Sequence, residues 1–125
     1  MHALKITSDN YCLEMAVIIR ETAHALHRGY AKLATNPGMA EPDAQMGLLC
    51  LPHVDEVYRK ALNKLYIIED DVKQLQSKEA DAQINAFIHI VDILKRHDEY
   101  QYLRDIADHI SKAASVLHGI VIQIG

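Results

Sequence analysis

Apolar residues recur every three or four positions along most of the chain, in four separate stretches. The stretches cover residues 12–33, 54–75, 80–94 and 103–124. Alternating steps of three and four place the apolar side chains in one stripe along a helix, which is the stripe that packing in a helical bundle requires. The pattern therefore predicts four amphipathic helical segments that pack against one another.

Turn and capping residues mark the limits of the first two segments. Ser8 can cap the first helix, which should end before the turn residues 36–38. We expect a loop from there to Leu51, with a short helical turn after Pro42. Pro52 suits the start of the second helix, because the N–H that proline lacks would be unpaired there.

The limits of the last two segments are less marked. Nothing between Ser77 and Asp81 has to break a helix, but the third stripe is rotated by about 140° from the second at 100° per residue. Either the chain turns here or one long helix changes neighbours, and we expect a turn. Asp98 can cap the last helix. The sequence thus predicts a single domain over residues 1–125, an all-α, up-and-down bundle of four helical segments.

Composition and charge limit the class of protein further. With five Gly and three Pro among 125 residues, the chain has too few turn residues for a β-sandwich or a β-barrel. Its net charge of −4 gives no electrostatic reason to bind nucleic acid. Cys12 and Cys50 fit no metal or redox spacing, and no apolar run approaches the about 20 residues of a membrane span. We therefore expect a cytoplasmic protein with reduced thiols and no nucleic-acid partner.

The chain carries no recognisable catalytic motif. It has no phosphate loop, no nucleophile elbow and no Cys/His zinc pattern. Glu21 and His24 have the Glu-x-x-His spacing of di-iron bundles, but those bundles need two such pairs, and here there is one. Both residues also lie off the first apolar stripe. We interpret them as part of a solvated helix face, and we expect no enzymatic activity.

Two acidic clusters are the candidates for a metal site. The first is a run of three acids centred on Asp70, which faces away from the second apolar stripe. The second comprises Asp105, Asp108 and His109, which share a helix face because they lie three and four residues apart. Two carboxylates and an imidazole can bind a transition metal such as iron, manganese or zinc. The alternative for this cluster is an ordinary ion pair between Asp108 and Lys112.

Apolar residues outside the stripes indicate a surface for self-association. Leu13 and Val17 lie off the first stripe on an otherwise polar flank. The third segment carries an excess of apolar residues at Ile88, Ile90 and Ile93. Together they are candidates for a contact between copies of the chain. The alternative is that both strips are covered within the monomer.

The end of the chain resembles a known protein family. Residues 103–125, LRDIADHISKAASVLHGIVIQIG, are similar to the last helix of the PhoU-like proteins. The similarity is to the branch encoded beside Pit-type inorganic phosphate permeases. Its members typically end in an "LE..(A/T)D....A..L.GIV" helix, preceded by an "LE..AD" helix whose counterpart here is residues 65–70. The resemblance implies a PhoU-like helical bundle.

The resemblance also implies a metal site. The family signature is a Glu or Asp followed four residues later by Asp, and in some members it binds iron, zinc or other metal ions on the bundle surface. Asp70 and Asp108 occupy the second position of this pair, whereas the first is Tyr66 in one helix and Arg104 in the other. Asp105, with Glu69 as a further candidate, would then supply a ligand at a different spacing. The expected ligands of a divalent metal are therefore Asp70, Asp105 and Asp108.

The function that the resemblance implies is a non-enzymatic, accessory role in the regulation of phosphate uptake. Such proteins dock on a membrane phosphate transporter or a signalling partner from the cytoplasmic side. Family members usually contain two three-helix repeats, and this chain matches the second repeat alone. The resemblance implies either a truncated member or one that completes itself by self-association, and we expect a homo-oligomer. Two alternatives remain open. The chain could be a metal-binding helical bundle, or a structural or interaction bundle unrelated to phosphate.

Overall fold

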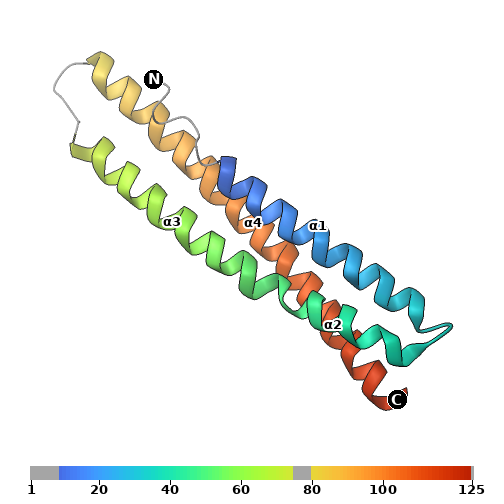
Figure 1. Cartoon of the computed structure of the whole chain (residues 1–125). Helices are drawn as coiled ribbons and strands as arrows, with labels where there is room; N and C mark the ends of the chain where they lie inside the picture. Colours follow the sequence, from blue (N-terminus) through green and yellow to red (C-terminus); the bar gives the residue numbers. More distant parts are fainter. Residues whose placement is uncertain (1–8, 75–79, 125) are drawn as a thin grey trace.

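The computed structural model describes residues 9–74 and 80–124, and within them the side chains of residues 10–69 and 84–124. All regular structure in this part of the chain is helical (Figure 1). The helices are α1 (Asp9–Lys32), the 3-10 helix η2 (Pro37–Ala40), α2 (Glu41–Leu48), α3 (Cys50–Gln74) and α4 (Ala80–Ile124). The predicted all-α fold is confirmed.

Three of these helices are long and lie side by side, with α3 running opposite to α1 and α4 (Figure 1). The short helix α2 packs against α1 and α4 towards the C-terminal end of the chain. Near the start of α1, the ring of Tyr11 meets the ring of Tyr100 on α4 edge to face, at 6.4 Å between centroids. Within the described residues, the part of α4 well before Tyr100 extends past α1 and lies beside α3 (Figure 1).

The last helix, α4, is continuous over 45 residues, so the predicted division into a third and a fourth segment is wrong. Asp98 lies inside this helix and does not cap its start. The sequence between Leu94 and Leu103 contains no Gly or Pro, so nothing in it stops a helix. The apolar stripe shifts along α4 because the helix changes neighbours, from α3 in its first part to α1 and α2 as well in its second.

The predicted turn between the second and third segments falls at residues 75–79, outside the described residues, as does Ser8 at the start of the chain. The first helix ends as predicted before residue 36. The expected loop up to Leu51 is instead mostly helical, because it contains η2, α2 and the start of α3. Each of the three prolines stands in the first turn of one of these helices, where a missing N–H costs nothing.

A first core lies where α1, α3 and α4 meet. Its buried residues are Met15, Cys50, Val54, Val57, Ala61, Leu65, Tyr100 and Ala107. The second predicted stripe contributes Val54, Ala61 and Leu65 to this core, which confirms its orientation. On α1 the buried face is centred one position away from the predicted stripe, so Met15 is buried and Ala16 is exposed.

A second core closes the end of the bundle where α2 lies. It consists of Ala40, Ala44, Leu117 and Val121, with Leu26 and Leu33 packed against it. Glycine lets the backbone of α2 approach α4 closely here. A Cβ added to Gly47 would lie 2.7 Å from the Cβ of Ala114, which is closer than two carbon atoms can approach.

Candidate functional site

Arg104 joins α4 to α3 beside the predicted metal ligands. Its Nε donates a hydrogen bond to Asp55 Oδ1 at 2.8 Å, and its guanidinium lies 5.5 Å from the centre of the Tyr58 ring. The hydrogen bond to Asp55 raises the pKa of Arg104 above its ordinary value. Asp55 also pairs with Arg59 one turn further along α3, at 2.8 Å. The side chain of Arg104 therefore holds two helices together.

Asp105 takes part in a second link between the same two helices. The Tyr58 hydroxyl donates to Gln101 Oε1 at 2.8 Å, and Gln101 Nε2 donates to Asp105 Oδ1 at 3.1 Å. Tyr58 thus holds Gln101, and Gln101 holds one oxygen of the exposed Asp105 carboxylate. The carboxylate has a defined position on the surface of α4.

Asp108 is paired within its own helix. Its Oδ2 lies 2.8 Å from Lys112 Nζ, an i,i+4 ion pair. The hydrogen bond from Lys112 lowers the pKa of Asp108 and raises the pKa of Lys112. The Asp108–Lys112 ion pair that the alternative interpretation predicts is therefore present.

The structure does not gather the predicted metal ligands into one group. Among the side chains that it describes, no three His, Cys, Asp or Glu residues lie close enough together to hold a metal ion. Asp105 and Asp108 are on the same helix but have different partners, Gln101 and Lys112. The side chain of Asp70, on α3, lies outside the described residues. Metal binding at these aspartates stays a prediction.

The polar contacts of α2 were not predicted from the sequence. The buried carboxylate of Asp43 lies 2.7 Å from Lys32 Nζ and 3.6 Å from Arg28 Nε, both on α1. On the other side of α2, Glu41 Oε1 lies 2.6 Å from His118 Nδ1 on α4. Asp43 therefore holds α2 to α1, and Glu41 holds α2 to α4.

Ser111 of α4 links the end of α2 to the start of α3. Its hydroxyl oxygen accepts a hydrogen bond from the Leu51 N–H at 2.9 Å. The same oxygen lies 3.3 Å from the carbonyl oxygens of Gly47 and Leu48. The hydroxyl thus provides a partner for one of the N–H groups that a helix leaves unpaired in its first turn.

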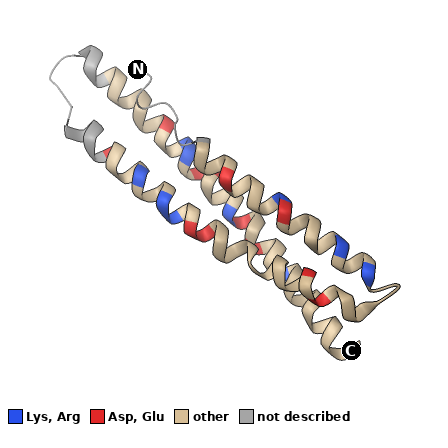
Figure 2. Ribbon diagram, in the orientation of Figure 1, with Lys and Arg blue, Asp and Glu red and all other residues tan. Residues whose placement is uncertain are grey.

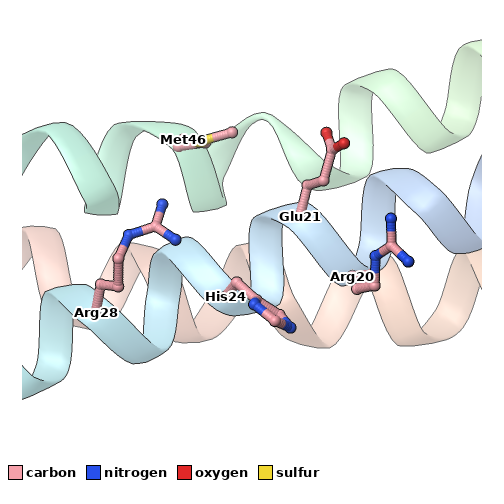
Figure 3. A pocket seen from close by; sticks show the side chains of 5 residues that line it. All are labelled: Arg20, Glu21, His24, Arg28 and Met46. Carbon is pink, nitrogen blue, oxygen red and sulfur yellow. The ribbon is translucent and has the colours of Figure 1, made fainter.

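A shallow hollow of about 220 Å³ lies between α1 and α2 (Figure 3). Arg20, Glu21, His24, Arg28 and Met46 line it. The side chain of Glu21 points towards α2, whereas the ring of His24 points to the other side of α1 (Figure 3). Glu21 and His24 therefore do not face a common point, and both are exposed, which agrees with their interpretation as a solvated helix face.

Large apolar side chains are exposed in a row along the first half of α4. We call this the apolar row: Ile84, Phe87, Ile88 and Leu94, together with the half-buried Val91. Phe87 is 66% exposed and Leu94 is 60% exposed. Asp92 is the one charged residue between positions 84 and 94, and this part of α4 is largely free of charge in Figure 2. The third predicted stripe is therefore a surface of the molecule, not part of its core.

The residues predicted for self-association divide between surface and core. Leu13 is 65% exposed, and Ile88 is exposed as part of the apolar row. Ile93 instead packs against the first core, and Val17 and Ile90 are half-buried. The expectation was wrong for Ile93, because it lies on the face of α4 that meets the rest of the bundle.

Both cysteines are free thiols. Cys50 is fully buried in the first core, and this burial raises the pKa of its thiol, against a smaller opposite effect of a hydrogen bond with Thr22. Cys12 is half-buried, with its Sγ 3.8 Å from Glu99 Oε2. Cys50 therefore stays protonated and acts as a small apolar residue of the core.

Comparison with protein families, with curated proteins and with solved structures found no match to this chain. The described helices include none with the length and apolar character needed to cross a membrane.

Proposed function

We propose that this chain is a non-enzymatic accessory protein that acts by docking, and that it serves the uptake of phosphate. The observation that carries the docking role is the apolar row on α4. A contiguous row of large apolar side chains on the surface of a folded protein is typical of an interaction site. The link to phosphate is supported by the resemblance of residues 103–125 to the last helix of PhoU-like proteins.

The arrangement of α4 supports separate roles for its two halves. The second half is tied to the rest of the bundle through contacts that include Arg104 with Asp55 and the Tyr30 hydroxyl with the Ala113 carbonyl at 3.0 Å. The first half carries the apolar row and lies beside α3. The second half thus maintains the fold, and the first half offers a surface to a partner.

The proposed partner is a membrane phosphate transporter or a signalling protein, approached from the cytoplasmic side. Cytoplasmic loops of membrane proteins carry an excess of Lys and Arg. The net charge of −4 gives this chain a long-range attraction to such loops, which falls with rising ionic strength. Charge would bring the partners together, and specific contacts would then hold them.

Phosphate uptake through a Pit-type permease tests this proposal. Uptake of labelled phosphate is measured in cells that express the permease alone and in cells that also express this chain. We expect the chain to change the uptake rate and to co-purify with the permease from a detergent extract. An unchanged rate without co-purification would contradict the phosphate role.

Two matched variants connect the effect to the apolar row. Leu94→Lys places a charge in the row, whereas Leu13→Lys places the same charge on a similarly exposed leucine of α1. We expect the first variant to lose the effect on uptake and the second to keep it. Equal effects of both variants would remove the apolar row from the proposed function.

A further inference from the structure

The apolar row has the spacing of a helix that pairs lengthwise with another helix. Ile84, Phe87, Val91 and Leu94 follow one another in steps of three, four and three. A row with this spacing normally faces a neighbouring helix, and each of its side chains fills a space between side chains of that helix. Here the two end residues, Ile84 and Leu94, are 58% and 60% exposed.

The helices of the same chain are already engaged elsewhere. On α4, Ala86 is buried and Ile93 packs against the first core. At 100° per residue, these two positions lie about 200° and 180° around the helix from Ile84. The bundle therefore covers the face of α4 opposite the row. The Tyr11–Tyr100 contact places the start of α1 beside a part of α4 that follows the row, so α1 begins past Leu94 towards the C-terminal end of α4.

The row offers large apolar side chains to a partner. Ile84, Phe87, Ile88 and Leu94 are 58%, 66%, 56% and 60% exposed. A second copy that covered them would remove this apolar surface from water, which favours association.

The row is complementary to itself when two copies run in opposite directions. An antiparallel pairing centred on residue 89 places Ile84 opposite Leu94 and Phe87 opposite Val91, so every layer of the contact is apolar. A two-fold axis needs such a self-complementary surface. In a parallel pairing the next residue at this spacing, the exposed Asp98, would instead face its own copy, and like charges repel.

We infer that the occupant of the apolar row is a second copy of this chain, in an antiparallel pair centred near His89. The inference rests on the proposed function and changes one part of it: the row would hold two copies of the chain together, and the pair would then meet the transporter or signalling protein through its other surfaces. The absence of charge between Ile84 and Leu94, apart from Asp92, matches the charge-poor centre of protein interfaces.

Sedimentation of the full chain over a range of concentrations tests this inference. We expect a reversible dimer for the native sequence. Leu94→Lys and Phe87→Lys should weaken the dimer by about tenfold or more, because they place a charge in an apolar contact. Leu13→Lys should leave the dimer intact. All three side chains are exposed in the monomer, so helical content by circular dichroism should be unchanged in each variant.

Cysteine cross-linking tests the orientation of the pair. In a Cys12→Ser background, Ile84→Cys chains mixed with Leu94→Cys chains should form a disulfide between the two variants under an added oxidant. Ile84→Cys chains alone should not cross-link to one another. A disulfide between two copies of residue 84 would show a parallel pair and overturn the antiparallel arrangement.

The failure of this inference can be told from the failure of the proposed function. A native chain that stays monomeric, or a dimer that dissociates with Leu13→Lys and not with Leu94→Lys, overturns the second-copy inference. If a monomeric chain still changes phosphate uptake and loses this effect with Leu94→Lys, then the row contacts the permease and the proposed function stands.

Discussion

Arg104 of α4 donates a hydrogen bond to Asp55 of α3 at 2.8 Å, across 49 residues of sequence. A bond of this kind fixes how far one helix is shifted along the other, because the side chains can meet in one register only. The same guanidinium lies over the Tyr58 ring, 5.5 Å from its centre, so both contacts of Arg104 join α4 to α3.

Breaking the Arg104–Asp55 contact should reduce stability. Arg104→Ala leaves the Asp55 carboxylate with its second partner, Arg59, so we expect a loss of about 1 kcal/mol in the free energy of unfolding by urea. Arg59→Ala is the control. The Arg59–Asp55 pair is more exposed and lies within one helix, so its loss should cost about 0.3 kcal/mol. An equal loss in both variants would contradict a special role for the link between helices.

The Asp108–Lys112 pair should give the stability a defined dependence on pH. The pKa of Asp108 is lowered in the folded state, so the pair contributes above the ordinary value of 3.8 and is lost as the pH falls further. The pKa of Lys112 is raised, so the contribution is also lost as the pH rises above the ordinary 10.5. Lys112→Met should lower Tm between these limits, and the difference from the native chain should shrink on either side. A difference that is constant down to low pH would show that the pair contributes nothing.

Gly47 should tolerate no larger side chain. In Gly47→Ala the new Cβ meets the Cβ of Ala114, and we expect a loss of about 1–3 kcal/mol despite the better helix propensity of Ala. Adding Ala114→Gly should restore part of this loss. Gly119→Ala is the matched control, because nothing lies within 4 Å of its added Cβ, and it should gain about 0.5–1 kcal/mol. Thermal unfolding of the native chain and the three variants decides between these outcomes.

Removal of the Ser111 hydroxyl should loosen the joint between α2 and α3. Ser111→Ala leaves the Leu51 N–H without its acceptor, so we expect a loss of about 1 kcal/mol and faster exchange of the Leu51 amide hydrogen. The exposed Ser115 provides the comparison, since Ser115→Ala should change neither quantity. Unchanged exchange at Leu51 in Ser111→Ala would show that the hydrogen bond does not hold the joint.

The sequence predicted where most of the helices lie, but it predicted less well which faces of the helices pack against one another. Hydrophobic spacing is a local property, so it located α1 and α3 and the buried face with Val54 and Leu65. The continuity of α4 has a local signal, because the segment from Leu94 to Leu103 has no helix-breaking residue. A stripe at 80–94 shows that a helix has an apolar face, but its spacing is the same whether that face meets its own chain or another molecule.

In the candidate site, the contacts between residues close in sequence were predictable, and the contacts between distant residues were not. The Asp108–Lys112 pair follows from the i,i+4 rule, which needs only the local sequence. The contacts of Ser111 with Leu51 and of Glu41 with His118 span 60 and 77 residues. They depend on the register of packed helices, which no local pattern specifies. The same is true of the Arg104–Asp55 bond.

Because α4 is one unbroken helix, it has a fixed length. At 1.5 Å per residue its 45 residues extend over about 68 Å, with no proline along them to act as a hinge. In an antiparallel pair centred on residue 89, the two C-terminal ends would therefore point in opposite directions, about 100 Å apart. Such a pair is bivalent: it carries two identical ends at a fixed separation, and it can bind two partners whose own spacing matches that separation more tightly than it binds either one alone.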